Sequence, residues 1–230
     1  SQGVEAHTAI ESARETIANL IHTNDDSIIF TSGGTESCNM AVLGAARKHR
    51  LQGNHIISTA VEHHAVLNAC KQLEREGFEV TYLPVDRYGF VTVDQVKKAL
   101  RPTTILVSIM YVNNEIGTIE PIADIGKLLL RVRKESGSVY PYFHTDACQA
   151  AQYLELDVEK LHVDLMTLNS GKIYGPKGVG CLYVRRGVTF EPLMYGGSQE
   201  NHLRPGTENV AGIVGFATAF ALARKEAKKE

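Results

Sequence analysis

Short apolar runs of strand length alternate with segments of helical periodicity along most of this chain. The runs at 27–31, 55–59 and 104–110 are each followed by a segment whose apolar residues recur at helical spacing. Strands that alternate with helices are typical of a mostly parallel sheet covered by helices on both faces. With 230 residues and 43% hydrophobic content, the chain can bury the core of one large α/β domain.

The last two expected strands lie close together in the sequence. We expect strands at 163–168 and 178–184, and the residues between them are too few to contain a crossover helix. The final strand should therefore run antiparallel to its predecessor. The predicted fold class is α/β, a mostly parallel sheet with one antiparallel strand and helices on both faces. The remaining elements expected are strands at 79–84 and 139–145, and helices at 6–20, 38–50, 94–100, from Pro121 and from near Asn209.

Charge and cysteine usage exclude several classes of function. The formal net charge of -2 gives no basic field, so we expect no nucleic-acid partner. The longest apolar runs are strand-sized, so no membrane span is expected. The four cysteines are widely spaced and form no metal-binding pattern. They predict no metal site and are typical of reduced interior thiols in an intracellular, cytoplasmic protein.

The stretch from Asn169 to Gly178 directly follows the apolar run at 163–168. It delivers Lys172 where an α/β sheet usually offers its ligand crevice, at the end of a strand. Polar residues and glycines around the lysine suit an anion such as phosphate. A lysine nucleophile beside such a shell indicates a Schiff-base site for pyridoxal 5'-phosphate. An exposed lysine in a glycine-rich turn explains this stretch equally well when it is taken alone.

A second candidate anion site follows the run at 27–31, where Gly33, Gly34 and Thr35 open a helical segment. Backbone N–H groups and the helix dipole favour an anion at such a helix start, and hydroxyl groups add donors. The alternative is an ordinary capped helix start, with Ser32 or Thr35 as the capping residue.

Polar residues also stand at the ends of three other expected strands. Asp146 ends the run at 139–145, and a buried carboxylate there is costly without a partner such as a pyridinium nitrogen. Its alternative role is a helix cap. His63 and His64 stand at a strand-to-helix junction, where histidines are commonly surface or capping residues. Asn114 is the second of two asparagines that are also good turn formers.

The order of these motifs is more specific than any one of them. In sequence they read SGGTES, VEHHAV, VNNEIG, HTDACQ, NSGKIYGPKG and RPGTEN. This order closely resembles the cysteine desulfurases of the NifS/IscS type, in the class V aminotransferase branch of fold-type I pyridoxal phosphate enzymes. Selenocysteine lyases belong to the same branch. The resemblance extends from about Ala6 to the final helix.

The resemblance implies a role for each matched position. Lys172 is expected to bind the cofactor aldehyde, and Asp146 to pair with the pyridine nitrogen. Gln149 is expected to donate to the phenolate oxygen. His63, rather than the variable His64, is expected to stack on the ring and assist proton transfer.

Other matched positions concern the phosphate, the substrate and a second chain. Asn114 is expected near the cofactor and the substrate carboxylate. Thr35 is expected to bind the phosphate, with backbone donors from Gly34. Thr207 is expected to reach the phosphate of a partner subunit, so the resemblance implies a homodimer. Family members commonly carry Ser-Gly-His before the lysine, whereas this chain has Asn169-Ser170-Gly171, and Ser170 is expected to supply the hydroxyl group from a shifted position.

The resemblance also implies a domain organisation and a reaction. Residues 1–230 correspond to the cofactor-binding large domain, and we expect an N-terminal arm and a C-terminal small domain outside this chain. The implied reaction converts L-cysteine to L-alanine and transfers sulfur to an enzyme cysteine, for iron–sulfur cluster or thio-cofactor synthesis with an acceptor or scaffold protein.

The sulfur-accepting cysteine and the arginine for the substrate carboxylate are expected in the absent C-terminal part. None of the four cysteines matches the acceptor, and Cys148 is read as a small residue behind the cofactor. The alternatives are a selenocysteine lyase, or a fragment that binds the cofactor without desulfuration.

Overall fold

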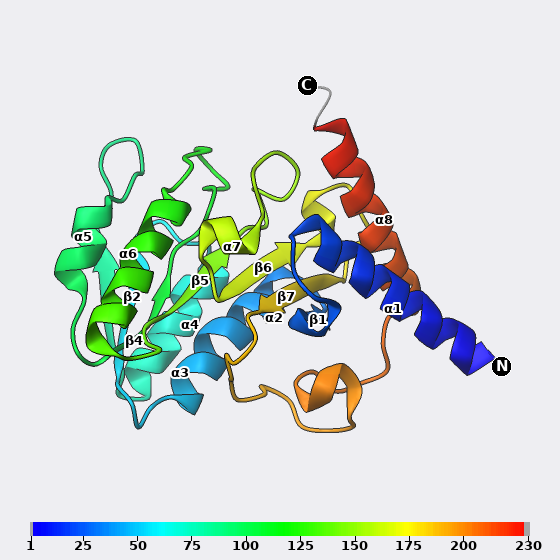
Figure 1. Cartoon of the computed structure of the whole chain (residues 1–230), viewed down its shortest axis with the longest axis horizontal. Coiled ribbons are helices and arrows are strands. Elements are labelled where there is room, and N and C mark those ends of the chain that lie inside the picture. Colours follow the sequence, from blue (N-terminus) through cyan, green and yellow to red (C-terminus); the bar gives the residue numbers. More distant parts are fainter. Residues whose placement is uncertain (1, 228–230) are drawn as a thin grey trace.

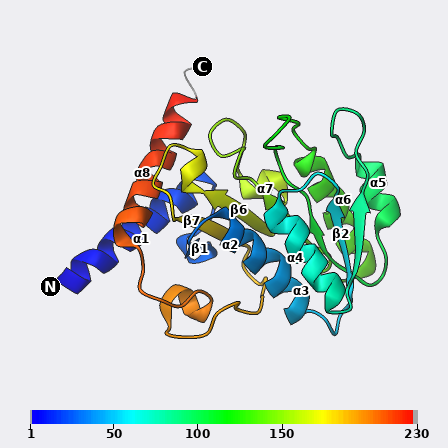
Figure 2. The same cartoon turned by 180° about the vertical axis from the view of Figure 1, so that it is seen from behind.

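This computed structural model describes residues 2–227. The chain forms a seven-stranded sheet. Helices cover both faces of the sheet (Figures 1 and 2). The strand order is β1-β7-β6-β5-β4-β2-β3. β7 pairs antiparallel with both β1 and β6, whereas all other pairs are parallel. Every strand except β7 therefore runs in one direction, which confirms the predicted fold class.

The strands lie close to the positions that the sequence predicts. They are β1 Ile28–Thr31, β2 His55–Thr59, β3 Glu79–Leu83, β4 Thr104–Ser108, β5 Tyr142–Asp146, β6 Leu165–Asn169 and β7 Gly180–Val184. The largest difference is in β5, which begins three residues later than expected. Pro141 directly precedes it, and a proline has no N–H to donate to a sheet ladder.

The helices also follow the predicted order, but two of them begin four residues early, at Gln2 and Gly34, and the short helix at Val158–Leu161 was not predicted. The α-helices are α1 Gln2–Leu20, α2 Gly34–Asn39, α3 Ala45–Lys48, α4 His64–Arg75, α5 Val93–Ala99, α6 Ile122–Ser136, α7 Val158–Leu161 and α8 Val210–Glu226. The helix expected from Cys38 begins instead at Gly34, directly after the turn that follows β1. A π-helical turn, Met40–Gly44, joins α2 to α3 without a break in helical backbone angles.

Alternate strand residues face two different cores. Phe143 packs into the core shared with α1, α5, α6, α7 and α8, whereas its neighbour Tyr142 packs into the core under α2 and α4. Figures 1 and 2 show these two helix layers on opposite faces of the sheet, and α1 beside α8 at the β1 edge. None of the helices in residues 2–227 is long and apolar enough to cross a membrane.

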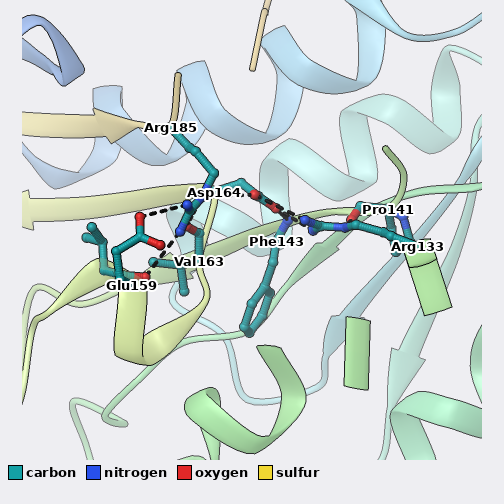
Figure 3. Close-up of polar contacts among 8 residues, drawn as sticks. Arg133, Pro141, Phe143, Glu159, Val163, Asp164 and Arg185 are labelled. Carbon is teal, nitrogen blue, oxygen red and sulfur yellow. Dashed lines mark hydrogen bonds and ion pairs between the residues drawn. The ribbon is translucent and has the colours of Figure 1, made fainter. Parts of the chain in front are cut away.

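A buried carboxylate ties several elements together at the amino end of β6. Asp164 accepts hydrogen bonds from the backbone N–H of Phe143 at 2.7 Å and from the guanidinium of Arg133 on α6. Arg185, which directly follows β7, approaches the same carboxylate, with its Nε 3.4 Å from Asp164 Oδ1. Figure 3 shows Asp164 between Arg133 and Arg185. Arg185 also binds Glu159 on α7 at 2.7 Å. This network fixes the amino end of β6, and β6 leads to the predicted lysine at its other end.

Candidate cofactor site

The predicted site residues follow strands that all run in the same direction. The carboxyl ends of β1, β2, β4, β5 and β6 therefore meet at one edge of the sheet, where ligands of open α/β sheets usually bind. A cavity of about 170 Å³ lies at this edge. Seven of the predicted residues line it: Gly34, Thr35, His63, Asn114, Asp146, Gln149 and Lys172.

Lys172 and Asp146 line the same cavity from neighbouring strands. Lys172 stands on a single 3₁₀ turn, Ser170–Lys172, which begins where β6 ends. The Asn169 side chain caps this turn by accepting a hydrogen bond from the Gly171 N–H at 3.2 Å. An apolar cavity of about 150 Å³ holds one benzene ring, so the space of about 170 Å³ between lysine and carboxylate suits a single ring.

The Asp146 carboxylate is buried, with 8% of the residue exposed. Its oxygens accept hydrogen bonds from the Cys148 backbone N–H at 3.0 Å and from the Cys38 thiol at 3.5 Å. No ion pair to Asp146 occurs within residues 2–227. Burial, and then the Asp146 charge, raise the pKa of the Cys38 thiol well above its usual range. A buried carboxylate with two weak donors and no cation suits a protonated ring nitrogen.

His63 combines a capping role with a place in the cavity. Its Nδ1 accepts a hydrogen bond from the Ala65 N–H at 3.1 Å and so caps α4. Because Nδ1 is an acceptor, the neutral ring carries its proton on Nε2. His63 lines the cavity, whereas His64 does not. The backbone cap therefore fixes the tautomer of a ring that faces the site.

The two asparagines after β4 have separate functions. Asn113 is buried, and its side-chain oxygen accepts from the N–H groups of Glu115 at 2.9 Å and Ile116 at 3.1 Å. It is therefore the turn former. Asn114 is exposed and lines the cavity, which makes its side chain available to a ligand.

Gly34 and Thr35, at the amino end of α2, also line the cavity. Gly33 precedes them with a φ of 147°, a backbone conformation that favours glycine. Neither Ser32 nor Thr35 caps the helix with its side chain. The first N–H groups of this helical run therefore stay available to an anion, together with the exposed Thr35 hydroxyl.

Two predicted residues are not brought to the cavity. The Ser170 hydroxyl is buried without a hydrogen-bond partner in the described residues, and it faces Gly175, where an added Cβ would lie 2.3 Å away. Thr207 is exposed in the loop before α8. That loop is attached to the start of α2 by an ion pair between Arg204 and Glu36, with Nε and Oε1 2.9 Å apart.

The cavity also contains residues that the motif comparison did not select. Met110, Val112 and Asn169 are these residues, and Cys148, expected from the sequence to lie behind the cofactor, completes the lining. Asn169 occupies a place near Gly34, since a Cβ added there would lie 3.5 Å from Asn169 Nδ2. Its position directly after the buried strand was the available signal. Met110 and Val112 carry no polar signal, so only the path of the chain after β4 reveals them.

These residues fit the cofactor that the sequence resemblance implies. A primary amine, a buried carboxylate without a cation, an aromatic ring with a free N–H and a helix start meet around one ring-sized space. In that order, these four groups match the aldehyde, pyridine nitrogen, ring face and phosphate of pyridoxal 5'-phosphate.

Comparison with known proteins agrees with this arrangement. The aminotransferase class-V family model matches residues 1–230. Cysteine desulfurase IscS of Dictyoglomus turgidum is 56% identical over 228 residues, which cover 99% of this chain and 56% of that protein. A solved structure described as a NifS-like protein has a TM-score of 0.94 at 41% identity and matches 100% of this chain and 61% of its own. A structure described as SspA in complex with cysteine has a TM-score of 0.88 at 42% identity, covering 95% of this chain and 62% of its own.

The chain thus spans little more than half the length of the curated relatives that it matches. The similarity extends over the whole cavity edge of the sheet and confirms the NifS/IscS resemblance. The chain belongs to the aminotransferase class-V family.

Proposed function

We propose that this chain is the pyridoxal phosphate-binding large domain of a cysteine desulfurase, which converts L-cysteine to L-alanine and transfers the sulfur to an enzyme cysteine. The observation that carries the proposal is one cavity lined jointly by Lys172, Asp146 and His63. The names of the similar proteins, and a neighbour solved with cysteine, favour cysteine over selenocysteine as substrate. Because relatives are nearly twice as long, the remaining residues of such an enzyme form its N-terminal arm and small domain in this proposal.

Each wall of the cavity has a task in the proposed reaction. When bound, the cofactor would supply an aromatic ring that accepts the electron pair of the substrate α-carbon. The Lys172 amine would hold the cofactor at its aldehyde and would move a proton at the substrate α-carbon. The Asp146 carboxylate keeps a proton on the ring nitrogen. The His63 ring stacks on the cofactor, and its Nε2–H lies ready for proton transfer.

The remaining donors position the cofactor and substrate. The Gly34 N–H and the Thr35 hydroxyl are the proposed phosphate donors at the start of α2. Gln149 is proposed to donate to the phenolate oxygen, and Asn114 to bind near the substrate carboxylate. Ser170 has the weakest support, because its hydroxyl faces Gly175.

The sulfur acceptor is proposed to lie outside these residues. All four cysteines are buried and free. Burial raises the pKa of Cys70 to about 12 and that of the other three thiols further above their usual value. A protonated, buried thiol is a poor nucleophile. In the proposal, a cysteine of the enzyme outside these residues accepts the sulfur. An acceptor or scaffold protein then receives the sulfur in the cytoplasm, for iron–sulfur cluster or thio-cofactor synthesis.

A homodimer is also part of the proposal. The loop with Thr207 is exposed, and the Arg204–Glu36 ion pair holds it next to the start of α2. In a dimer, Thr207 is proposed to reach the phosphate site of the partner subunit. Sedimentation velocity of the purified chain tests this part: a monomer at all concentrations, with unchanged cofactor binding by Thr207→Ala, contradicts it.

The central test concerns the lysine. The chain loaded with pyridoxal phosphate is reduced with borohydride, and the mass increase is located by peptide mapping. We expect the increase on Lys172, its loss in Lys172→Ala, and its retention in Lys177→Ala, which removes the exposed neighbouring lysine. A covalent adduct that persists in Lys172→Ala contradicts the assignment.

Sulfide release from cysteine separates an active enzyme from a binding-only fragment. The assay is run with a small thiol as sulfur acceptor, first with L-cysteine and then with L-selenocysteine. An adduct on Lys172 without sulfide release indicates that this chain binds the cofactor but lacks the residues for desulfuration. Selenide release from L-selenocysteine, without sulfide release from L-cysteine, favours the lyase reaction.

A further inference from the structure

Glu62 is a buried carboxyl group directly before His63, with 4% of the residue exposed. Its Oε1 accepts a hydrogen bond from the Thr59 hydroxyl at 2.9 Å and another from the Met110 backbone N–H at 2.8 Å. Its Oε2 has no partner within residues 2–227. One oxygen of this carboxyl group therefore connects the end of β2 to the segment that follows β4.

The two segments that Glu62 connects form different walls of the cavity. The segment after β2 carries His63, and the segment after β4 begins at Met110 and continues to Asn114. A second hydrogen bond, from Asn113 Nδ2 to the Val61 carbonyl oxygen at 3.1 Å, joins the same segments.

The contact at Met110 extends toward the buried carboxylate of the site. The next residue, Tyr111, donates its backbone N–H to the Asp146 carbonyl oxygen at 2.9 Å. Three consecutive cavity segments, after β2, β4 and at the end of β5, are therefore hydrogen-bonded in series. Glu62 provides the only side chain in the described residues that accepts from both of the first two segments.

We propose that Glu62 is a positioning residue, whose carboxyl group sets the distance between the histidine wall and the asparagine wall of the cavity. Without it, the Met110 N–H would be buried with no acceptor, and the Asn113 contact would be the one hydrogen bond left between these two segments in the described residues. This role deepens the proposed function and rests on it.

The charge state of Glu62 agrees with such a role. Burial, with smaller contributions from the nearby carboxylates of Asp146 and Glu120, raises its pKa to about 8, although the hydrogen bonds from Met110 and Thr59 lower it. The thiols of Cys38 and Cys70 also face it, and burial keeps both protonated. Glu62 is therefore neutral at pH 7. Since Oε1 accepts two hydrogen bonds, the proton belongs on Oε2, and a glutamine amide has the same shape and the same acceptor.

This reasoning selects the variants. Glu62→Gln keeps a neutral acceptor, whereas Glu62→Ala removes it, and Glu62→Asp replaces the alanine variant should that one fail to fold. Glu120→Ala is the matched control, because Glu120 is also buried with one unpartnered oxygen in the described residues, but its other oxygen accepts from the Val91 N–H and not from a cavity residue such as Met110. The measurements are the dissociation constant for pyridoxal phosphate, thermal unfolding, and hydrogen exchange of the Met110 amide in the protein without cofactor.

We expect Glu62→Ala to weaken cofactor binding about tenfold, as for one buried hydrogen bond lost, and to expose the Met110 amide to exchange. Glu62→Gln should keep binding within about threefold and keep the amide protected. Glu120→Ala should lower the unfolding temperature without changing either readout. Unchanged binding in Glu62→Ala, or equal weakening in Glu120→Ala, overturns the proposal.

The failure of the proposed function has a different signature. In that case the wild-type chain takes up no cofactor on Lys172, while the exchange of the Met110 amide still reports whether Glu62 holds the two segments together. A Met110 amide that stays protected in Glu62→Ala overturns the structural link by itself.

Discussion

At the scale of single residues, the cavity walls are packed too closely to accept an extra methyl group. A Cβ added at Gly34 would lie 2.9 Å from the Cys148 Sγ, which is shorter than real Cβ contacts. Gly34 and Cys148 come from β1 and β5 ends that are far apart in sequence but share the cavity. The small side chain at position 34 is therefore required by one named neighbour.

This contact predicts a change of sign in a double-mutant cycle. Gly34→Ala should destabilise the wild-type chain by about 1–2 kcal/mol, because overpacking costs more than the helix propensity gained. In a Cys148→Ala background, the same change should be neutral or stabilising by up to about 1 kcal/mol. The free energy of unfolding in urea provides the measurement. Equal effects in both backgrounds would show that Cys148 is not the obstacle.

At the scale of secondary-structure elements, two buried histidines link neighbouring strands through hydroxyl groups. His144 on β5 contacts Ser108 Oγ on β4 at 2.8 Å and Thr167 Oγ1 on β6 at 3.0 Å. His55 on β2 makes the same arrangement with Thr104 on β4 at 2.8 Å and Thr81 on β3 at 2.9 Å. Burial lowers the pKa of both histidines to about 4, so both rings are neutral at pH 7.

The lowered pKa values predict a loss of stability in acid. Between pH 6.5 and about 4, the unfolded chain binds more protons at these histidines than the folded chain does. Their stabilising effect is complete above pH 6.5 and is lost as the pH falls toward 4. For His144 the slope is up to about 1.4 kcal/mol per pH unit.

The measurement compares variants with wild type, because the contribution of Glu62 to the free energy of unfolding changes in the opposite direction between pH 4.5 and 8. The difference between two chains that both contain Glu62 isolates the effect of the histidine. The free energy of unfolding is determined from pH 4.5 to 7.5 for wild type, His144→Gln and His7→Gln, the last being an exposed control. The deficit of His144→Gln should shrink as the pH falls below 6.5, whereas His7→Gln should follow wild type. A deficit for His144→Gln that stays constant with pH would refute the assignment.

At the scale of the whole molecule, one ion pair holds the loop before α8 against the first helix and the first strand. Glu200 accepts from Arg14 at 2.7 and 2.8 Å and from the Phe30 backbone N–H at 2.7 Å. Its side chain is 3% exposed and that of Arg14 is 12% exposed. Segments near both ends of the sequence are thus joined beside β1, which leads to the Gly34 wall of the cavity.

Removing one partner of this buried pair should be costly. Glu200→Ala should destabilise the chain by about 3–5 kcal/mol, because the Arg14 charge and the Phe30 N–H lose their acceptor. Glu11→Ala is the matched control: Glu11 contacts the same arginine at 3.3 Å but is 44% exposed, so its loss should cost less than about 1 kcal/mol. Urea unfolding measures both values. Similar losses for the two variants would contradict this account.

Part of this molecule follows from the sequence alone. The strand positions and the reversed β7 follow from apolar runs and from the short connection between β6 and β7, because such signals are local. The class of the site follows from the order of polar motifs at strand ends. The resemblance also selects Asn114 for the site, but the turn-forming role of Asn113 does not follow from the sequence, since its burial and its hydrogen bonds to Glu115 and Ile116 depend on the fold.

Only the tertiary structure decides which of the candidate groups meet. It brings Asn169, Met110 and Val112 to the cavity, turns the Ser170 hydroxyl toward Gly175, and leaves Thr207 exposed. It also places Glu62 between two loops that are separated by almost fifty residues of sequence. The physical reason is that strand patterns arise from neighbours along the chain, whereas side-chain direction and hydrogen-bond partners depend on which strands lie side by side.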